Sequence, residues 1–305
     1  MILISAPCHP YLIETLKAKG YEVEYSPEIS YDELSAKIGR ITGLVVTTRQ
    51  QVDAALIAKA DLLKWIGRLG SGMELIDVES AAARNIKCVS SPEGNRNAVA
   101  EHTLGLLLNI EQNIRKSADE VRDLKWLREP NRGTEISGKT IGIVGYGNTG
   151  EAFSKLLAGF KTTILAYDKY RFGFGRAQVK EANLEQIARY ADVISFHVPL
   201  SAETRYMANA EFFNSLQRKP VILNTSRGEV VDTNALIDAL RSGAVSGAGL
   251  DVLENESPST YNQVEKEQLQ FLSAHPRVIV TPHIAGYTHE AFLKMSEVLV
   301  KKLKL

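Results

Sequence analysis

TIGIVGYGNTG, at residues 140–150, places three glycines directly after a short apolar run. The run at residues 140–144 contains four β-branched residues, which predicts a buried strand. The glycines follow in the spacing Gly-x-Gly-x-x-Gly, and the apolar pattern of residues 151–158 predicts a helix after them. A strand, a glycine loop and a helix in this order predict a βαβ unit.

A glycine loop in this position can hold the pyrophosphate of a dinucleotide. The first glycine makes a tight turn, the second lets backbone N–H groups approach the phosphates, and the third allows the helix to pack closely on the strand. The N-terminus of the helix adds partial positive charge. We therefore predict cofactor contacts from the six loop residues Gly145, Tyr146, Gly147, Asn148, Thr149 and Gly150.

An acidic residue follows the next predicted strand. Asp168 comes 23 residues after Gly145, near the separation of about 20 residues expected for a residue that binds the ribose 2′-OH. A carboxylate accepts hydrogen bonds from that hydroxyl and repels a 2′-phosphate, so Asp168 favours NAD over NADP. Lys169 and Arg171 follow closely, and their positive charge leaves some use of NADP open.

Strands and helices are expected to alternate along most of the chain. This alternation predicts two α/β domains, each with a doubly wound parallel sheet covered by helices on both faces. A proline-free helical segment over residues 97–127 is expected to lead from the first domain to the second. The last helix, from residue 290 to about 303, is expected to pack back on the first. Strands are predicted at residues 1–5, 23–25, 43–48, 64–68, 87–89, 140–144, 163–167, 193–196, 221–224, 247–250 and 278–281.

Composition excludes several classes of protein. The 305 residues are enough for about two domains. The 36 basic and 36 acidic side chains cancel, so no overall positive field would attract nucleic acid or a membrane surface. Cys8 and Cys88 form neither a disulfide framework nor a Cys-x-x-Cys pair, so we expect a reducing cytoplasm and no metal site. No signal peptide or membrane-spanning run is expected.

Three polar stretches follow predicted strands, where open α/β sheets bind their ligands. Arg227 lies in the first stretch, and its guanidinium suits a substrate carboxylate because it can bond both oxygens. The second stretch carries acidic residues after Asp251. The third carries His283, whose imidazole could take a hydroxyl proton as hydride leaves the same carbon. A nearby glutamate would orient that imidazole and stabilise its protonated form.

Arg227, His283 and a glutamate form a candidate catalytic trio, but chemistry alone does not decide which glutamate or which histidine belongs to it. Several glutamates lie in the acidic stretch and its surroundings, and five other histidines are rival bases. The glutamates are Glu254, Glu256, Glu265 and Glu267, and the histidines are His9, His102, His197, His275 and His289.

Seven motifs in order resemble the D-2-hydroxyacid dehydrogenase family over nearly the whole chain. They are Ile66-Gly67-Arg68 through Ile76-Asp77, Asn97-Ala98-Val99-Ala100-Glu101-His102, the glycine loop, His197-Val198-Pro199-Leu200, Asn224-Thr225-Ser226-Arg227-Gly228, Gly249-Leu250-Asp251-Val252 and Thr281-Pro282-His283-Ile284-Ala285-Gly286.

The resemblance implies roles for the trio. Arg227 should bind the substrate carboxylate and keto oxygen, and His283 should be the acid and base. The family's pattern Asp-Val-x-x-x-Glu selects Glu256 over Glu254, although Ser257 stands where the family usually has proline. Backbone N–H groups near Ser71 and Gly72 should hold the other side of the substrate carboxylate. Further NAD contacts are expected from His197, Val198, Pro199, Thr204, Thr225, Ser226, Asp251, Ala285 and Gly286.

The resemblance also implies an organisation. A flavodoxin-like substrate domain would take residues 1–97 and 284–305, and a Rossmann NAD-binding domain would take residues 98–283. A homodimer would form through the nucleotide domains.

Within the family, the chain looks most similar to short-type D-3-phosphoglycerate dehydrogenases without a C-terminal regulatory domain. Arg49 and Asn95 stand where that subfamily lines its substrate cleft, and Arg49 is expected to reach a substrate phosphate. The best expectation is oxidation of 3-phosphoglycerate to 3-phosphohydroxypyruvate in serine biosynthesis. Reduction of glyoxylate, hydroxypyruvate or another 2-keto acid stays open, and so does an NAD(H)-sensing corepressor-like protein.

Overall fold

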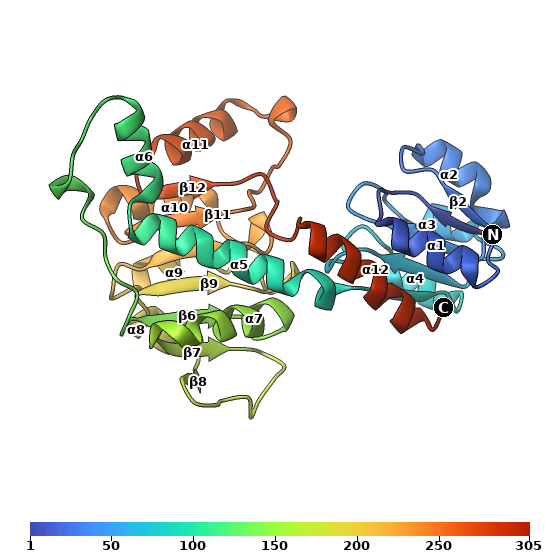
Figure 1. The fold of residues 1–305 in the computed structure, drawn as a ribbon, viewed down its shortest axis with the longest axis horizontal. Coiled ribbons are helices and arrows are strands. Elements are labelled where there is room, and N and C mark those ends of the chain that lie inside the picture. Colours follow the sequence, from blue (N-terminus) through green and yellow to red (C-terminus); the bar gives the residue numbers. More distant parts are fainter. The chain divides into compact units, whose positions relative to one another are not determined.

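A computed structural model describes all residues, 1–305, and divides the chain into two compact units. Unit 1 comprises residues 1–96 and 286–305, and unit 2 comprises residues 97–285. These limits lie one or two residues from the domain limits expected from the sequence. Figure 1 shows that each unit has a sheet of its own with helices packed around it.

Unit 1 contains a five-stranded parallel sheet in the order β2-β1-β3-β4-β5. This is the flavodoxin-like strand order, as expected from the sequence. The strands are β1 (Ile2–Ile4), β2 (Val23–Tyr25), β3 (Gly43–Val46), β4 (Trp65–Arg68) and β5 (Lys87–Ser90). The helices are α1 (Pro10–Ala18), α2 (Tyr31–Lys37), α3 (Ala54–Ala58), α4 (Val78–Ala83) and α12 (His289–Leu303), and α5 (Pro92–Glu111) begins in this unit.

Unit 2 contains a seven-stranded parallel sheet in the order β12-β11-β10-β9-β6-β7-β8. Numbered within the unit, six strands follow the Rossmann order and a seventh is added beside the sixth, which confirms the predicted fold. The strands are β6 (Thr140–Val144), β7 (Thr163–Tyr167), β8 (Val179–Glu181), β9 (Val193–Phe196), β10 (Val221–Asn224), β11 (Gly247–Leu250) and β12 (Val278–Val280). The helices are the rest of α5, α6 (Ile114–Arg122), α7 (Asn148–Leu156), α8 (Leu184–Tyr190), α9 (Ala210–Ser215), α10 (Thr233–Ser242) and α11 (Gln263–Ala274).

Each sheet is buried on both faces, which explains why its strands are continuous apolar runs. In unit 2, one face packs on α5 and α7, and the other packs on α8, α9, α10 and α11. In unit 1, α2, α3 and α4 cover one face, while α1 and the C-terminal helix α12 cover the other. Short 3-10 helices lie at Ile38–Arg40, Glu129–Asn131, Leu157–Phe160, Gly228–Val230 and Pro258–Thr260. None of the helices is both long and apolar enough to cross a membrane.

The single helix expected over residues 97–127 is wrong in two respects. The first helix, α5, starts earlier at Pro92, whose fixed φ and missing N–H are tolerated in a first helical turn. It ends at Glu111, and α6 begins at Ile114. Asn113 between them has a left-handed backbone with φ of 52°. Asparagine adopts this conformation more readily than most residues, and it stops the helix.

Helix α5 offers a test of the close packing in unit 1. An added Cβ at Gly94 would lie 2.5 Å from the backbone N of Met295 in α12, whereas a Cβ at Gly105, in the same helix, would meet nothing within 4 Å. Gly94→Ala is expected to destabilise the protein by about 1–3 kcal/mol, because a backbone must move to admit the methyl group. Gly105→Ala should be neutral or stabilise by up to about 1 kcal/mol, because alanine is the better helix former. Chemical denaturation measures both, and equal stability of the two variants would contradict this packing.

Candidate active site

The carboxyl ends of the unit 2 strands bring most of the predicted site residues to one edge of the sheet. The strands are parallel throughout, so their ends meet at the edge where ligands bind in such sheets. The residues that follow the strand ends are Gly145 after β6, Asp168 after β7, His197 after β9, Thr225 to Arg227 after β10, Asp251 after β11 and Thr281 to His283 after β12.

The glycine loop needs its first and third glycines for steric reasons. Gly145 has φ of 96°, and an added Cβ there would lie 2.6 Å from the carbonyl oxygen of His197. At Gly150 an added Cβ would lie 2.1 Å from the carbonyl oxygen of Gly145. At Gly147, by contrast, an added Cβ would meet nothing within 4 Å. The middle glycine therefore faces open space, as expected where a ligand approaches the backbone.

Helix α7 starts inside this loop, at Asn148, three residues earlier than predicted. Its N-cap is Gly147, and no side chain caps the helix. The first N–H groups of any helix lack intrahelical partners, so those at the start of α7 are available to a ligand. An uncapped helix start beside an open glycine fits the pyrophosphate of a dinucleotide.

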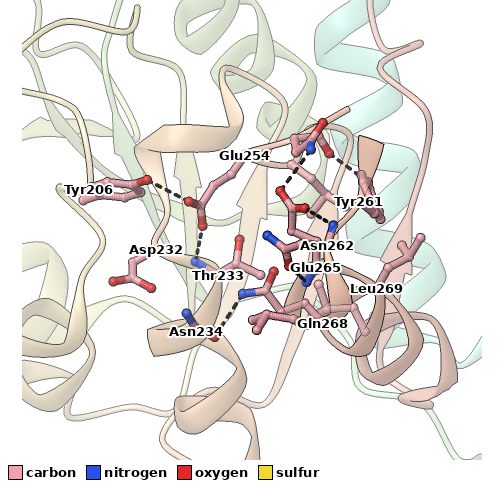
Figure 2. Close-up of a pocket in the computed structure, with 14 residues that line it drawn as sticks. Tyr206, Asp232, Thr233, Asn234, Glu254, Tyr261, Asn262, Glu265, Gln268 and Leu269 are labelled. Carbon is pink, nitrogen blue, oxygen red and sulfur yellow. Dashed lines mark hydrogen bonds between the residues drawn. The ribbon is translucent and has the colours of Figure 1, made fainter. Parts of the chain in front are cut away.

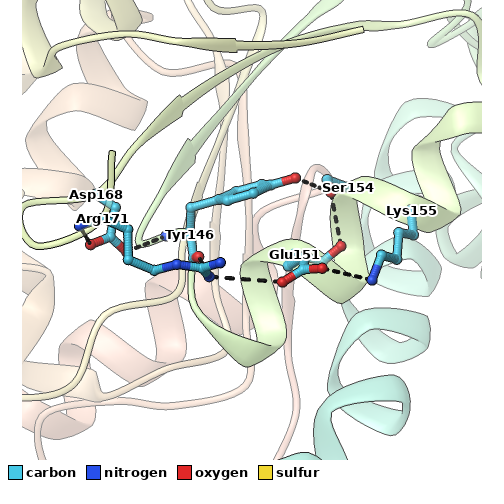
Figure 3. Close-up of polar contacts among 6 residues, drawn as sticks. All are labelled: Tyr146, Glu151, Ser154, Lys155, Asp168 and Arg171. Atoms are coloured by element: carbon cyan, nitrogen blue, oxygen red, sulfur yellow. Dashed lines mark hydrogen bonds and ion pairs between the residues drawn. The ribbon is translucent and has the colours of Figure 1, made fainter. Parts of the chain in front are cut away.

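The carboxylate of Asp168 is bound to the glycine loop itself (Figure 3). Its Oδ2 accepts a hydrogen bond of 2.9 Å from the backbone N of Tyr146. Its Oδ1 accepts two more, of 2.9 Å from the N of Tyr170 and 3.0 Å from the N of Arg171. These bonds hold the carboxylate beside the glycine loop. Oδ2 keeps acceptor capacity for a ribose hydroxyl.

Arg171 and Tyr146 complete this side of the loop. The Arg171 guanidinium donates to the backbone carbonyl of Tyr146 and lies 3.8 Å from the carboxylate of Glu151. The Tyr146 side chain is buried, its hydroxyl lies 2.9 Å from Ser154 Oγ, and its ring stacks on Phe174. The arginine is thus already bound to the loop beside Asp168.

His197 is a buried, neutral histidine at the end of β9. Burial lowers the pKa of its imidazole to about 3. Its Nε2 lies 2.9 Å from Ser195 Oγ, while its Nδ1 is buried without a hydrogen-bond partner. Buried polar atoms usually have partners, so an unpaired one indicates a place for a ligand or water. This atom lies in the residue that contacts Gly145, which agrees with a cofactor site there.

The turn after β10 presents Arg227. The buried side chain of Asn224 accepts from the backbone N of Ser226 at 3.1 Å and donates to the carbonyl of Arg227 at 2.9 Å. The guanidinium Nη1 donates to the Ser226 carbonyl at 2.7 Å, and the residue is half-buried. The arginine therefore extends from a rigid turn whose shape is fixed by an internal amide.

His283 and Glu256 form a pair. The imidazole Nδ1 lies 2.8 Å from Glu256 Oε2, and both side chains are partly exposed. No hydrogen bond engages the other ring nitrogen, Nε2. A carboxylate on Nδ1 orients the ring and stabilises its protonated form, which leaves Nε2 to exchange a proton with a substrate.

The backbone of His283 is held in an unusual conformation. Its φ is 55°, in the left-handed region. The buried Asp251 carboxylate accepts from the N of Ile284 at 2.9 Å, the N of Ala285 at 2.7 Å and the hydroxyl of Thr281 at 2.6 Å. The carbonyl of Asp251 accepts from the N of His283 at 2.8 Å. The carboxylate expected to contact NAD therefore also fixes the turn that presents His283.

Sequence reasoning missed this structural role of Asp251, and it missed the contribution of α5. His102 Nε2 lies 3.0 Å from Thr281 Oγ1, and the Thr103 hydroxyl lies 3.0 Å from that of Thr225. The signals in the sequence were the position of Thr225 directly after one predicted strand, the position of Thr281 at the end of another, and the motif that ends at His102.

The remaining predicted contacts in unit 2 are turn residues. Val198 packs beside Gly145, with its Cγ1 at 3.0 Å from an added Cβ there. The Thr204 hydroxyl donates to the carbonyl of Pro199 at 2.6 Å, so it closes the turn after β9. No group of three or more His, Cys, Asp or Glu side chains is arranged as a metal site.

Unit 1 holds the other residues expected to bind the substrate, Arg49, Ser71, Gly72 and Asn95, together with Gly286. Arg49 follows β3, and its guanidinium donates to the carbonyls of residues 27–29 and pairs with Glu28 at 3.1 Å. Ser71 and Gly72 follow β4. The Ser71 hydroxyl donates to Asn95 Oδ1 at 3.2 Å. These residues lie at the carboxyl edge of this sheet, but Arg49 already has local partners.

A sequence model described as the D-isomer specific 2-hydroxyacid dehydrogenase, NAD binding domain, matches residues 104–285. The D-3-phosphoglycerate dehydrogenase of Archaeoglobus fulgidus is 33% identical over 305 residues, covering 99% of this chain and 56% of that protein. The chain thus spans about half the length of that relative. The hydroxypyruvate reductase of Thermotoga maritima is 34% identical over 92% of this chain and 90% of that protein.

The chain is also similar to a dehydrogenase of solved structure. The D-lactate dehydrogenase of Aquifex aeolicus, in complex with NAD and lactic acid, has a TM-score of 0.85 and 26% identity, over 99% of this chain and 94% of that one. The matched region contains the glycine loop, Asp168 and the pair at His283. The chain therefore belongs to the D-isomer specific 2-hydroxyacid dehydrogenase family and carries its NAD-binding domain.

Proposed function

We propose that this protein is an NAD-dependent dehydrogenase that interconverts a D-2-hydroxy acid and the corresponding 2-keto acid. The observation that carries the proposal is the His283–Glu256 pair at 2.8 Å, on the same sheet edge as Arg227 and the glycine loop. An acid–base group, a cation for a carboxylate and a dinucleotide loop are the three components that this reaction needs.

The glycine loop and Asp168 would hold NAD, which would supply the hydride acceptor for oxidation at the carbinol carbon and, in its reduced form, the hydride donor for reduction. His283 Nε2 takes the hydroxyl proton in oxidation and gives it back to the keto oxygen in reduction. Glu256 stabilises the imidazolium that results, because opposite charges in contact favour the charged form. Arg227 binds the substrate carboxylate and places the carbinol carbon for transfer. The buried His197 stays neutral, so it adds no charge beside the cofactor.

For the substrate, 3-phosphoglycerate and 3-phosphohydroxypyruvate are the first candidates, which would place the enzyme in serine biosynthesis. The 33% identity to a D-3-phosphoglycerate dehydrogenase and the position of Arg49 at the edge of unit 1 support this choice. Hydroxypyruvate is the second candidate, because the chain covers 90% of a hydroxypyruvate reductase at 34% identity. Unit 1 would be the substrate domain, with Ser71, Gly72 and Asn95 beside Arg49.

We also propose a homodimer formed through unit 2, in the cytoplasm. Five large apolar side chains are exposed within residues 114–127, which is a feature of association surfaces. They are Ile114, Val121, Leu124, Trp126 and Leu127. The two cysteines are unpaired, in agreement with a reducing compartment.

His283→Ala is expected to lower kcat by about 100- to 10,000-fold, the usual contribution of a general acid–base group. NADH binding, measured by fluorescence titration, should stay unchanged. The exposed histidine of α12 provides the control, because His289→Ala should retain activity. Turnover of a panel of 2-keto acids is followed by NADH absorbance. A wild-type protein that binds NADH but reduces none of them would support a sensor of NADH and exclude the proposed enzyme.

Arg49→Ala should raise KM for 3-phosphohydroxypyruvate by about tenfold or more, because a charged contact to phosphate is lost. KM for unphosphorylated hydroxypyruvate should change little. Arg84 is a matched control, since it also pairs with a carboxylate in unit 1, at 3.2 Å from Asp61, but follows the end of α4. Equal effects of Arg49→Ala on both substrates would overturn the phosphate assignment.

Trp126→Glu should convert the dimer into a monomer, because it places a charge among exposed apolar side chains. Trp126 itself is 79% exposed. Light scattering after size-exclusion chromatography measures the mass. Leu62→Glu, at an exposed leucine of unit 1, should leave the mass unchanged. A monomeric wild-type protein would refute the dimer.

A further inference from the structure

Glu254 lies two residues before Glu256, the partner of His283, and its carboxylate is bound at both oxygens (Figure 2). Oε2 accepts from the hydroxyl of Tyr206 at 2.7 Å. Oε1 accepts from the backbone N of Thr233, the first residue of α10, at 2.9 Å. The bond to Glu254 raises the pKa of the Tyr206 hydroxyl. Glu254 thus joins the loop after β11 to two separate segments of unit 2.

The same loop contacts the turn that presents Arg227. An added Cβ at Gly228 would lie 1.9 Å from the carbonyl oxygen of Leu253 and 2.6 Å from the backbone N of Glu254. The backbones of the two loops are therefore in direct contact. Tyr206 is fixed to the Arg227 turn as well, because its N donates to the carbonyl of Glu229 at 2.7 Å. Any shift of residues 253–254 would change the spacing between Arg227 and Glu256.

Packing alone does not hold this loop. A pocket of about 380 Å³ lies between the loop and the helices α10 and α11, and Leu253, Glu254 and Asn255 form part of its wall. Polar bonds span the space instead, including that from Asn255 Nδ2 to Glu265 Oε1 at 2.9 Å and that from the Tyr261 hydroxyl to the Asn255 carbonyl at 2.8 Å. A loop beside an unfilled space depends on its hydrogen bonds for position.

We propose that Glu254 is a positioning residue for the acid–base pair: its bonds to Tyr206 and to the start of α10 fix the loop that presents Glu256 to His283. The inference rests on the proposed dehydrogenase function. Glu254 does not touch the reacting atoms, and it acts through the geometry of residues 253–256. The anionic carboxylate also suits the N-terminus of α10, where helices favour negative charge.

The test compares Glu254→Ala, Glu254→Gln and Tyr206→Phe. Glu254→Ala should lower kcat by about 10- to 100-fold, the effect of a small misplacement of catalytic groups, with the Kd for NADH unchanged. Glu254→Gln should recover most of the activity, because the amide can still accept from Thr233 and bond Tyr206. Tyr206→Phe should lower kcat less than Glu254→Ala does. Gln268→Ala is the control: it removes a bond of 2.9 Å to Asn234 in the same pocket without touching the loop.

A count of NADH sites distinguishes positioning from a general loss of folded protein. Titration with NADH gives the number of sites, and kcat is then expressed per site. Glu254→Ala should keep the wild-type number of sites and show the lower kcat per site, whereas Gln268→Ala should keep both at the wild-type level. A Glu254→Ala enzyme with wild-type kcat per NADH site would overturn the inference while the proposed function stood.

Amide hydrogen exchange of the protein alone gives a readout that needs no turnover. Peptides spanning residues 252–257 should exchange faster in Glu254→Ala than in wild type, and at the wild-type rate in Gln268→Ala. Unchanged exchange in Glu254→Ala would refute the proposal that the hydrogen bonds of Glu254 fix this loop. If the wild-type protein reduces no 2-keto acid, the proposed function fails, and the exchange result still decides whether Glu254 fixes the loop.

Discussion

The buried carboxylate of Asp251 constrains the position of the catalytic histidine we propose. It is 1% exposed and accepts hydrogen bonds from Thr281, Ile284 and Ala285, on both sides of His283. Hydrogen bonds to a charged group contribute about 1.5–3 kcal/mol each, and a buried carboxylate without them would cost several kcal/mol. The left-handed backbone of His283 costs about 1–3 kcal/mol. The hydrogen bonds exceed that cost, so the turn keeps its strained shape and aims the imidazole at Glu256.

The close spacing of neighbouring strands then positions the glycine loop, Arg227 and the loop of Glu256. Adjacent strands lie about 4.8 Å apart, so the loops that follow them touch through their backbones when no side chain separates them. Gly145 after β6 lies against His197 after β9, and Gly228 after β10 lies against Leu253 after β11. Both strand pairs are neighbours in the sheet. The glycines at these two points therefore set the distance between the cofactor loop and its neighbour, and between Arg227 and the loop of Glu256.

Local patterns were enough to predict the strands and the glycine loop. Buried parallel strands are apolar runs, and a glycine loop needs its glycines in a fixed spacing, so both features are visible in a short window of sequence. The break at Asn113 was missed because one left-handed residue interrupts an apolar pattern that otherwise continues. The helix α2 and the strand β8 were missed because each is short and has little apolar periodicity. The bonds of Asp251 and Glu254 connect residues 21 to 48 positions apart, and no window of sequence contains them.

The same dependence on distant bonds applies to Asp168. From the sequence alone, this carboxylate is expected to bind the ribose 2′-OH, while the glycine loop is expected to bind the pyrophosphate. In the structure it accepts the N–H of Tyr146, the residue between the first two glycines, and the N–H groups of Tyr170 and Arg171. Arg171 in turn donates to the carbonyl of Tyr146. The residue that would choose between NAD and NADP is therefore part of the framework of the phosphate loop. Since one carboxylate serves both purposes, cofactor preference and loop shape cannot be changed independently at this position.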